Sequence, residues 1–240
     1  MVVVATYNIH ACGGVDGRFD PERVAAVIRE IDADIIALQE VDAQRRISRY
    51  IDQWAFLAAA TGHHYTAGIA LRTHRRNFGN ALFTRQPVEC FRLHDVSFAM
   101  REPRGAIDAV VSIEGRKLRV IATHFGLSRA ERRHQAARLS AFLADRSDGY
   151  AAAATVLLAD LNEWRSTSRT LNEISRQFHP SPAPKSFPSR RPIFALDRVL
   201  AAGDARLSDV AVHRSVLARA ASDHLPVRGV LAWSERTEAS

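Results

Sequence analysis

The chain contains 240 residues, of which 47 % are hydrophobic and 25 % are charged, and its formal net charge is +7 at pH 7. This composition excludes a disordered chain, and the presence of only two cysteines excludes a disulfide framework. The longest nearly apolar run, residues 151–159, is far shorter than the roughly 20 residues of a membrane-spanning helix. Because no basic leader precedes the first apolar segment, we expect no signal peptide and a cytoplasmic location.

The hydrophobic pattern predicts strands and helices in mixed order. A β-branched run at 2–7 is typical of a buried strand, and Asp20-Pro21 supplies an N-cap and a first-turn proline for a helix. Ser128 and Glu131 have the spacing of a capping box, which predicts a helix that runs to about residue 145. Further strands are expected at 34–39, 66–71, 80–83, 88–96, 106–113, 118–123, 154–159, 196–200, 208–212 and 226–233, and further helices at 50–61 and 167–176.

This order of elements predicts an α/β protein in which two packed sheets are flanked by helices. We expect a single domain over residues 1–233, followed by a short polar tail at 234–240. The proline-rich segment at 179–193 is predicted to be a long surface loop.

Four predicted strands end at a polar or acidic residue. A strand buried on both faces accommodates a carboxylate only at a large desolvation cost, so each of these residues should lie where its strand emerges. If the four ends share one edge, they form one pocket. Asn162 would join this pocket, because it lies two residues beyond the last of them in an extended segment. The four residues are Asn8, Glu40, His124 and Asp160.

The residue types in this predicted pocket favour the hydrolysis of a phosphoester. Oxygen ligands with few cysteines suit Mg²⁺ or Mn²⁺ better than structural zinc. A hard cation can neutralise phosphate charge, a carboxylate can orient or deprotonate water, and an imidazolium can stabilise the charge that develops. Taken alone, an acid at a strand end is most often a solvated boundary residue, and a lone histidine is more often a hydrogen-bonded group than a catalyst. The joint arrangement is what indicates catalysis.

With these residues identified, the chain resembles the endonuclease/exonuclease/phosphatase superfamily, the group related to pancreatic deoxyribonuclease. The resemblance extends from residue 6 to residue 227 in the order of the family's motifs. It implies a four-layer α/β/β/α sandwich with the site at one edge of the paired sheets. The matching segments are Thr6-Tyr7-Asn8-Ile9-His10, Leu38-Gln39-Glu40-Val41, Gly79-Asn80-Ala81-Leu82-Phe83, Thr123-His124-Phe125, Leu158-Ala159-Asp160-Leu161-Asn162, Leu196-Asp197-Arg198-Val199 and Ser222-Asp223-His224-Leu225-Pro226-Val227.

The resemblance also implies a role for each residue of the site. Glu40 would be the main ligand of the metal ion, with Asn8 supporting the metal site and Asp223 close to it. The implied catalytic group comprises a carboxylate that prepares the attacking water, three residues that hold the phosphate and an aspartate that orients the last histidine. Asp160 would prepare the water, Asn162, His124 and His224 would hold the phosphate, and Asp197 would orient His224.

Three arginines shortly after His124 are candidates for binding substrate. Arg129, Arg132 and Arg133 lie at the start of the helix predicted after residue 128 and could hold a second phosphate or an anionic head group. The alternative is a solvated helix face. The positive charges of the whole chain form no clear basic stripe, so nucleic acid is a possible but not an indicated partner.

Three functions remain open from the sequence. The first is a divalent-metal-dependent phosphoesterase that hydrolyses a phosphodiester, such as a lipid head group or another small diester. The second keeps the same site but acts on DNA or RNA, which would require binding that weakens steeply as salt rises. The third is a phosphate-binding scaffold without turnover. The chain disfavours this one, because every position of the implied chemistry carries the expected residue type.

Overall fold

The computed structural model describes residues 1–43, 51–73, 76–144 and 152–234. Within these residues eleven strands form two sheets with the orders β10-β11-β1-β2-β4-β3 and β5-β6-β7-β8-β9. The strands of the six-stranded sheet are β1 (Val2–Asn8), β2 (Ile35–Ala43), β3 (His64–Thr73), β4 (Arg76–Thr84), β10 (Ala205–Val212) and β11 (Val227–Trp233). Those of the five-stranded sheet are β5 (Val88–Asp95), β6 (Gly105–Ile113), β7 (Arg116–His124), β8 (Ala154–Asp160) and β9 (Asp197–Gly203).

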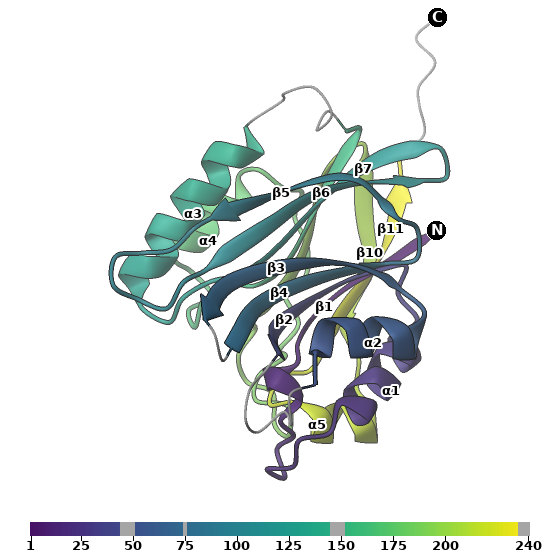
Figure 1. Ribbon diagram of the computed structural model, residues 1–240. Helices are drawn as coiled ribbons and strands as arrows, with labels where there is room; N and C mark the ends of the chain where they lie inside the picture. The colour runs from purple at the N-terminus through teal and green to yellow at the C-terminus, as the bar shows by residue number, and fades with distance from the viewer. Residues whose placement is uncertain (44–50, 74–75, 145–151, 235–240) are drawn as a thin grey trace, which may run out of the picture.

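Alternating side chains on the strands build a core on each face of both sheets. On β2, Ile35 and Ala37 point into the core between the sheets, whereas Ile36 and Leu38 pack toward the helices. One helical layer contains α1 (Pro21–Ile31), α2 (Gln53–Thr61) and α5 (Val216–Ala221), and the other contains α3 (Arg129–Leu143) and α4 (Arg169–Ser175). The fold is therefore the expected four-layer α/β/β/α sandwich (Figure 1).

Two parallel strand pairs position the ends of the central strands. The β1–β2 pair is parallel, with α1 in the connection, and the β7–β8 pair is parallel, with α3 in the connection. In the second pair His124 lies directly opposite Asp160, and on the antiparallel neighbour β9 Asp160 lies opposite Asp197. This register brings three polar side chains to one end of the five-stranded sheet.

Local sequence signals account for where the helices begin. Asp20 caps α1 by accepting a hydrogen bond from the backbone N–H of Arg23. The expected capping box of α3 is present, because Ser128 and Glu131 each accept a hydrogen bond from the other's backbone N–H. Residue 145, where this helix was expected to end, lies outside the described residues, as do residue 50 and most of the expected polar tail (235–240).

The Gly79-Asn80 step joins the two sheets below the strand ends. The Asn80 side chain donates to the backbone oxygen of Gly105 at 3.0 Å, and its own backbone oxygen accepts from the Trp54 indole at 3.1 Å. A Cβ atom at position 79 would clash with the backbone of Gly68 on the adjacent strand, which explains the glycine there.

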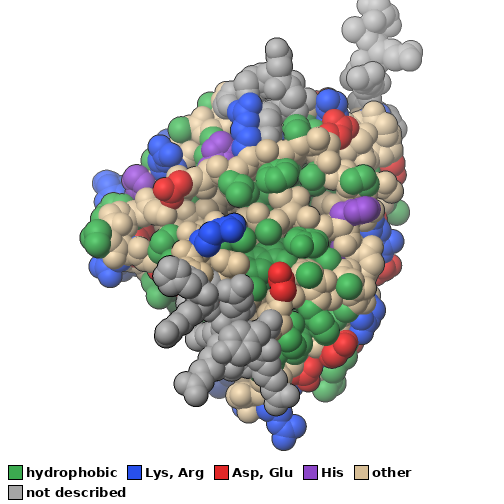
Figure 2. All heavy atoms as spheres, viewed as in Figure 1, with side chains coloured by type: hydrophobic (Ala, Val, Ile, Leu, Met, Phe, Trp, Pro, Cys, Tyr) green, Lys and Arg blue, Asp and Glu red, His purple; other side chains and the backbone are tan. Residues whose placement is uncertain are grey.

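The edge strands β3 and β5 lie side by side on the face that Figure 2 displays, and hydrophobic side chains gather over them. Among these strands' residues, Tyr65, Phe91 and Leu93 are exposed. The polar strand ends described above belong to other strands, so this apolar edge is separate from them. No helix in the described part of the chain is both long enough and apolar enough to cross a membrane.

Candidate active site

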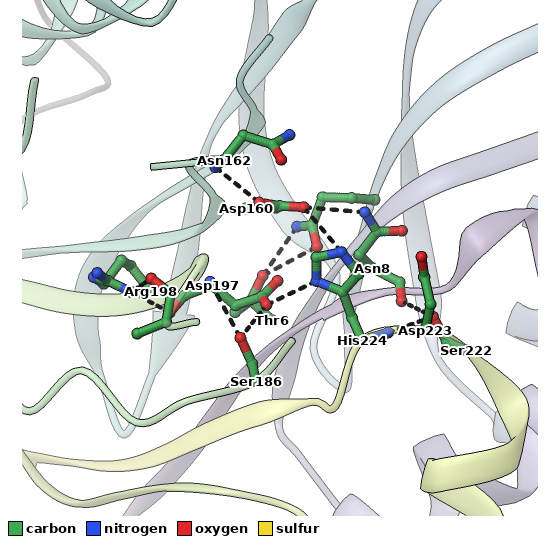
Figure 3. A network of polar contacts seen from close by, with 12 residues as sticks. Thr6, Asn8, Asp160, Asn162, Ser186, Asp197, Arg198, Ser222, Asp223 and His224 are labelled. Carbon is green, nitrogen blue, oxygen red and sulfur yellow. Dashed lines mark hydrogen bonds and ion pairs between the residues drawn. The ribbon is translucent and has the colours of Figure 1, made fainter. Parts of the chain in front are cut away.

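The Asp160 carboxylate is the centre of a buried polar network (Figure 3). Its Oδ1 atom accepts a hydrogen bond from the backbone N–H of Asn162 at 2.9 Å, and its Oδ2 atom accepts one from the Asn8 side chain at 3.0 Å. The Nε2 atoms of His124 and His224 lie 3.5 Å and 3.8 Å from the same Oδ2 atom. The structure thus brings together residues that are more than 200 positions apart in the sequence.

Asn8 orients two carboxylates at once. Its amide nitrogen donates to Glu40 at 3.1 Å and to Asp160 at 3.0 Å, while its Oδ1 atom accepts from the backbone N–H of His10 at 3.0 Å. Burial raises the pKa of Glu40, and the Asp160 charge adds to this rise, although the bond from Asn8 acts in the opposite direction. Two acidic groups are therefore held close together in a region of low solvation.

The expectation that β2 ends at Glu40 is wrong, because the strand continues to Ala43. The pairing of β2 with β4 shifts between Leu38 and Val41, which is a β-bulge at Glu40. Glu40 has a φ of 57°, and Asn162 has a φ of 47°, a region that side-chain-bearing residues rarely occupy. Both unusual backbone conformations lie at the site, where such strain tends to concentrate.

His224 and Asp197 form a buried pair. Nδ1 of His224 lies 2.9 Å from Oδ2 of Asp197, and Ser186 donates its hydroxyl hydrogen to the same carboxylate oxygen. Burial alone would lower the pKa of His224, but the charges of Asp197 and Asp160 outweigh burial and raise the pKa to about 10. At neutral pH His224 is therefore an imidazolium that presents its Nε2–H toward Asp160.

His124 is held in the opposite protonation state. Burial and the positive charge of Arg104 lower the pKa of His124 to about 3, although Asp160 acts in the opposite direction. Its Nε2 atom lies 2.9 Å from the amide nitrogen of Asn162, which also donates to the backbone oxygen of Phe125 at 2.9 Å. Both amide hydrogens of Asn162 are thus used within the protein. The donation to phosphate expected of Asn162 would require the exchange of one of these bonds.

Asp223 and its neighbour Ser222 lie on the solvent side of the network. The Asp223 side chain is 39 % exposed and stands 4.0 Å from the His10 ring, at Nδ1. Ser222 is buried, donates to the backbone oxygen of Asn8 at 2.7 Å and accepts from the backbone N–H of His224 at 3.2 Å. Ser222 therefore ties the last sequence motif to the end of β1.

Two groups of side chains could hold a metal ion. One ligand atom each from Asp160, Asp197 and His224 lies within 4.8 Å of the others. In that group, however, the Oδ2 atom of Asp197 already contacts Nδ1 of His224 and accepts the hydrogen of the Ser186 hydroxyl. The half-buried carboxylate of Glu40 and the buried carboxylate of Asp160, bridged by Asn8, are oxygen donors that fit a hard divalent cation.

The three predicted substrate-binding arginines separate in the structure. Arg132 is buried, and its Nε atom lies 3.3 Å from the equally buried Glu163 carboxylate. It also donates to the backbone oxygen of Leu127. Arg129 and Arg133 are exposed and line a hollow between α3 and α4. Arg132 is therefore occupied within the protein, whereas the other two can reach a ligand.

The predicted surface loop at 179–193 contributes to the site, although its serines were not among the predicted site residues. Ser186 and Ser189 are buried, and the backbone N–H of Ser189 donates to the backbone oxygen of Asp223 at 2.7 Å. The Phe187 ring lies 4.8 Å from the His224 ring. The expectation of a plain surface loop is thus wrong at these positions, because Asp197 and His224 need partners on their outer side.

An aromatic wall borders His224 and was also missed. The Trp164 ring packs edge-on against Phe187 at 5.6 Å and against Phe194 at 5.0 Å, and Trp164 remains 40 % exposed. The signal in the sequence is an isolated tryptophan two residues after Asn162. This wall gives the site an apolar side beside its charged groups.

Comparisons with known proteins agree with this geometry. The uncharacterized protein YbhP of Escherichia coli strain K12 is 29 % identical over an alignment of 242 positions that covers 93 % of this chain and 93 % of that one. An endonuclease/exonuclease/phosphatase from Beutenbergia cavernae superposes with a TM-score of 0.75 at 22 % identity, over 97 % of this chain and 72 % of that one. The mannosyl-6-phosphatase Bt3783 of Bacteroides thetaiotaomicron superposes with a TM-score of 0.76 at 16 % identity, over 97 % of this chain and all (100 %) of that one.

At these identities the two solved structures show a shared fold alone. The model of the Endonuclease/Exonuclease/phosphatase family, by contrast, matches residues 5–224, which includes every residue of the network around Asp160. Members of this family are typically metal-dependent phosphoester hydrolases, so a phosphoester substrate is implied. The chain belongs to the Endonuclease/Exonuclease/phosphatase family.

Proposed function

We propose that this protein hydrolyses a phosphodiester with the help of Mg²⁺ or Mn²⁺. The observation that supports it most strongly is the placement of Asp160, fixed by Asn8 and Asn162 between two imidazoles of opposite protonation state. A carboxylate beside an imidazolium suits the attack of water on a phosphorus atom, because the first activates the nucleophile and the second stabilises the negative charge that develops.

In this proposal Asp160 accepts a proton from the attacking water. One hydrogen of that water would pass to a carboxylate oxygen of Asp160. His224 donates its Nε2–H to a phosphoryl oxygen, and Asp197 holds the ring in that orientation through Nδ1. His124, kept neutral and oriented by Asn162, contacts the phosphate from the opposite side.

Glu40 would hold the metal ion, with Asn8 fixing the carboxylate and Asp223 close by. The fit rests on the donor set, because Glu40 is a half-buried carboxylate held beside Asp160 by the amide of Asn8. When bound, the ion would neutralise the charge on the phosphate oxygens. Activation of the water and contact with the phosphate are the roles of Asp160, His124 and His224.

A diester fits the charges of the site better than a monoester does. Glu40, Asp160 and Asp197 are acidic, and His224 supplies the cation among the side chains that contact Asp160 and Asp197. With the same metal ion bound, a singly charged diester meets less repulsion from these carboxylates than a doubly charged monoester does. The similarity to a mannosyl-6-phosphatase makes a sugar phosphate monoester the alternative to exclude.

A substrate panel tests the proposal. We would assay the purified protein against bis(p-nitrophenyl) phosphate, p-nitrophenyl phosphate, glycerophosphodiesters, plasmid DNA and RNA, each with Mg²⁺, Mn²⁺ or EDTA. We expect turnover of small diesters that EDTA abolishes. Preferential cleavage of the monoester would contradict the diester assignment, preferential cleavage of DNA or RNA would favour a nuclease, and no turnover of any substrate would favour a phosphate-binding scaffold.

A further inference from the structure

A hollow lined by arginines lies between the beginnings of α3 and α4. Arg129 and Arg133 come from α3, and Arg165 and Arg169 come from the segment after β8 and the first residue of α4. A neighbouring hollow shares Arg133 and Arg169, so the basic surface continues along the two helices. The four arginines therefore border one hollow.

The positive charge of this hollow is uncompensated. None of the four arginines forms an ion pair with an acidic group in the described part of the chain. Glu163 is the acidic residue of the lining, and its carboxylate is already paired with the buried Arg132 at 3.3 Å. Glu173 lines only the neighbouring hollow.

The arrangement opposes the stability of the two helices. Arg129 and Arg169 are the first residues of α3 and α4, where the helix dipole disfavours a cation. Arg129 and Arg133 are also four residues apart on one helix, where like charges repel each other. Helix electrostatics therefore do not explain Arg129 and Arg133, whereas a bound anion would relieve the repulsion between them.

Short, fixed segments connect the hollow to the site. Glu163 directly follows Asn162, and its Oε1 atom accepts a hydrogen bond from the backbone N–H of Arg165 at 3.2 Å. On the other side, Arg129 lies five residues after His124, at the end of a turn fixed by the capping box of α3. An anion in the hollow would consequently be held in a defined position relative to Asp160.

We propose that this hollow binds a second phosphate group of the same substrate molecule whose diester is hydrolysed at Asp160. This inference rests on the proposed function and specifies the substrate class as a molecule with two separate phosphate groups. A guanidinium group can donate two parallel hydrogen bonds to the oxygens of one phosphate. The Thr167 and Ser168 hydroxyls in the lining can donate further hydrogen bonds.

Matched substrates test the proposal. We would use p-nitrophenyl phosphodiesters of alkanediols, from propanediol to decanediol, with and without a phosphate on the free hydroxyl group. At one or more chain lengths of the alkanediol, the wild type should show a higher kcat/KM for the phosphorylated diester than for the unphosphorylated diester of the same length. In the double variant Arg165→Ala/Arg169→Ala this preference should fall by about tenfold or more, because each charge-assisted hydrogen bond contributes about that much. The control Arg214→Ala changes an exposed arginine that precedes α5 and should keep the preference.

A wild type without this preference, or a double variant that keeps it, would overturn the proposal. A binding measurement separates this failure from failure of the proposed function. By calorimetry with inorganic pyrophosphate and no metal, the double variant should bind at least tenfold more weakly than the wild type, even if no diester is turned over. Equal binding would overturn the hollow as an anion site. The alternative result is a double variant that loses affinity for oligothymidylate relative to the wild type, by a factor that grows with the length of the oligonucleotide. That result would overturn the proposal of a single second phosphate and favour a binding path for nucleic acid.

Discussion

The Nδ1 atom of His224 lies 2.9 Å from Oδ2 of Asp197, and this contact sets the charge of the site. The folded protein binds the His224 proton more tightly than the unfolded chain does, where a histidine pKa is about 6.5. The pair therefore stabilises the fold fully below about pH 6.5, and this contribution is lost as the pH rises through the folded-state pKa of about 10.

Replacing Asp197 should shift the pH dependence of activity. In Asp197→Asn the carboxylate charge is lost, so the pKa of His224 should fall by roughly one to three units. The alkaline limb of the pH–rate profile should move down by the same amount, and an NMR titration of the His224 ring checks the cause.

Ser186→Ala is the matched control for this shift. It removes a hydrogen bond to Asp197 but keeps the charge, so it should move the limb by less. An unchanged profile in Asp197→Asn would contradict the role of this pair.

Glu40→Gln tests which side chains hold the metal. The wild type should gain about 2.7 kcal/mol of stability at a metal concentration 100-fold above Kd, which raises Tm by roughly 5–10 °C for a domain of this size. Glu40→Gln should lose most of this rise, because the carboxylate charge that compensates the cation is gone.

Differential scanning fluorimetry with and without Mn²⁺ measures the effect, and Glu22→Gln, an exposed change on α1, is the control. A full metal-dependent rise in Glu40→Gln together with its loss in Asp197→Asn would place the ion at Asp160, Asp197 and His224 instead.

Asp108 should contribute to the stability of the fold and not to catalysis. Its carboxylate accepts from the buried Arg119 guanidinium at 2.8 Å and 2.6 Å, away from the site. Asp108→Asn should lower the free energy of unfolding by about 3–5 kcal/mol, because it leaves a buried guanidinium without its carboxylate. Urea unfolding measures the loss.

The exposed pair of Lys117 and Glu89, 3.1 Å apart, provides the control. Glu89→Gln should change stability by less than about 1 kcal/mol. Burial alone would raise the pKa of Asp108, but Arg119 lowers it, so its contribution is present above about pH 4 and is lost as the pH falls through the folded-state pKa. Equal losses in both variants would contradict this account of the pair.

Periodic patterns and capping residues were sufficient to predict much of the fold. The capping box of Ser128 and Glu131 is present, and β7 and β8 end at His124 and Asp160 as expected. Each of these signals involves residues that lie close together in the chain, so it can be recognised in a single sequence. The short helix α5 was missed, because its six residues are too few to show a helical period.

Features that depend on distant partners could not be predicted. The β-bulge at Glu40 arises from pairing between β2 and β4, and the sequence around Glu40 reads as a strand end. Ser186 donates a hydrogen bond to Asp197 only because the 179–193 segment folds over the site. The burial of Arg132 likewise follows from its pairing with Glu163, 31 residues away.

The most direct measurement of the central claim is the rate of bis(p-nitrophenyl) phosphate hydrolysis by Asp160→Asn beside the wild type, with Mn²⁺ and with EDTA. The substitution keeps the size of the side chain, and circular dichroism verifies the fold. We predict a wild-type rate that EDTA abolishes and a loss of about 10²–10⁴-fold in Asp160→Asn. A wild-type rate in the variant, or hydrolysis that is indifferent to EDTA, would contradict a metal-assisted reaction centred on this carboxylate.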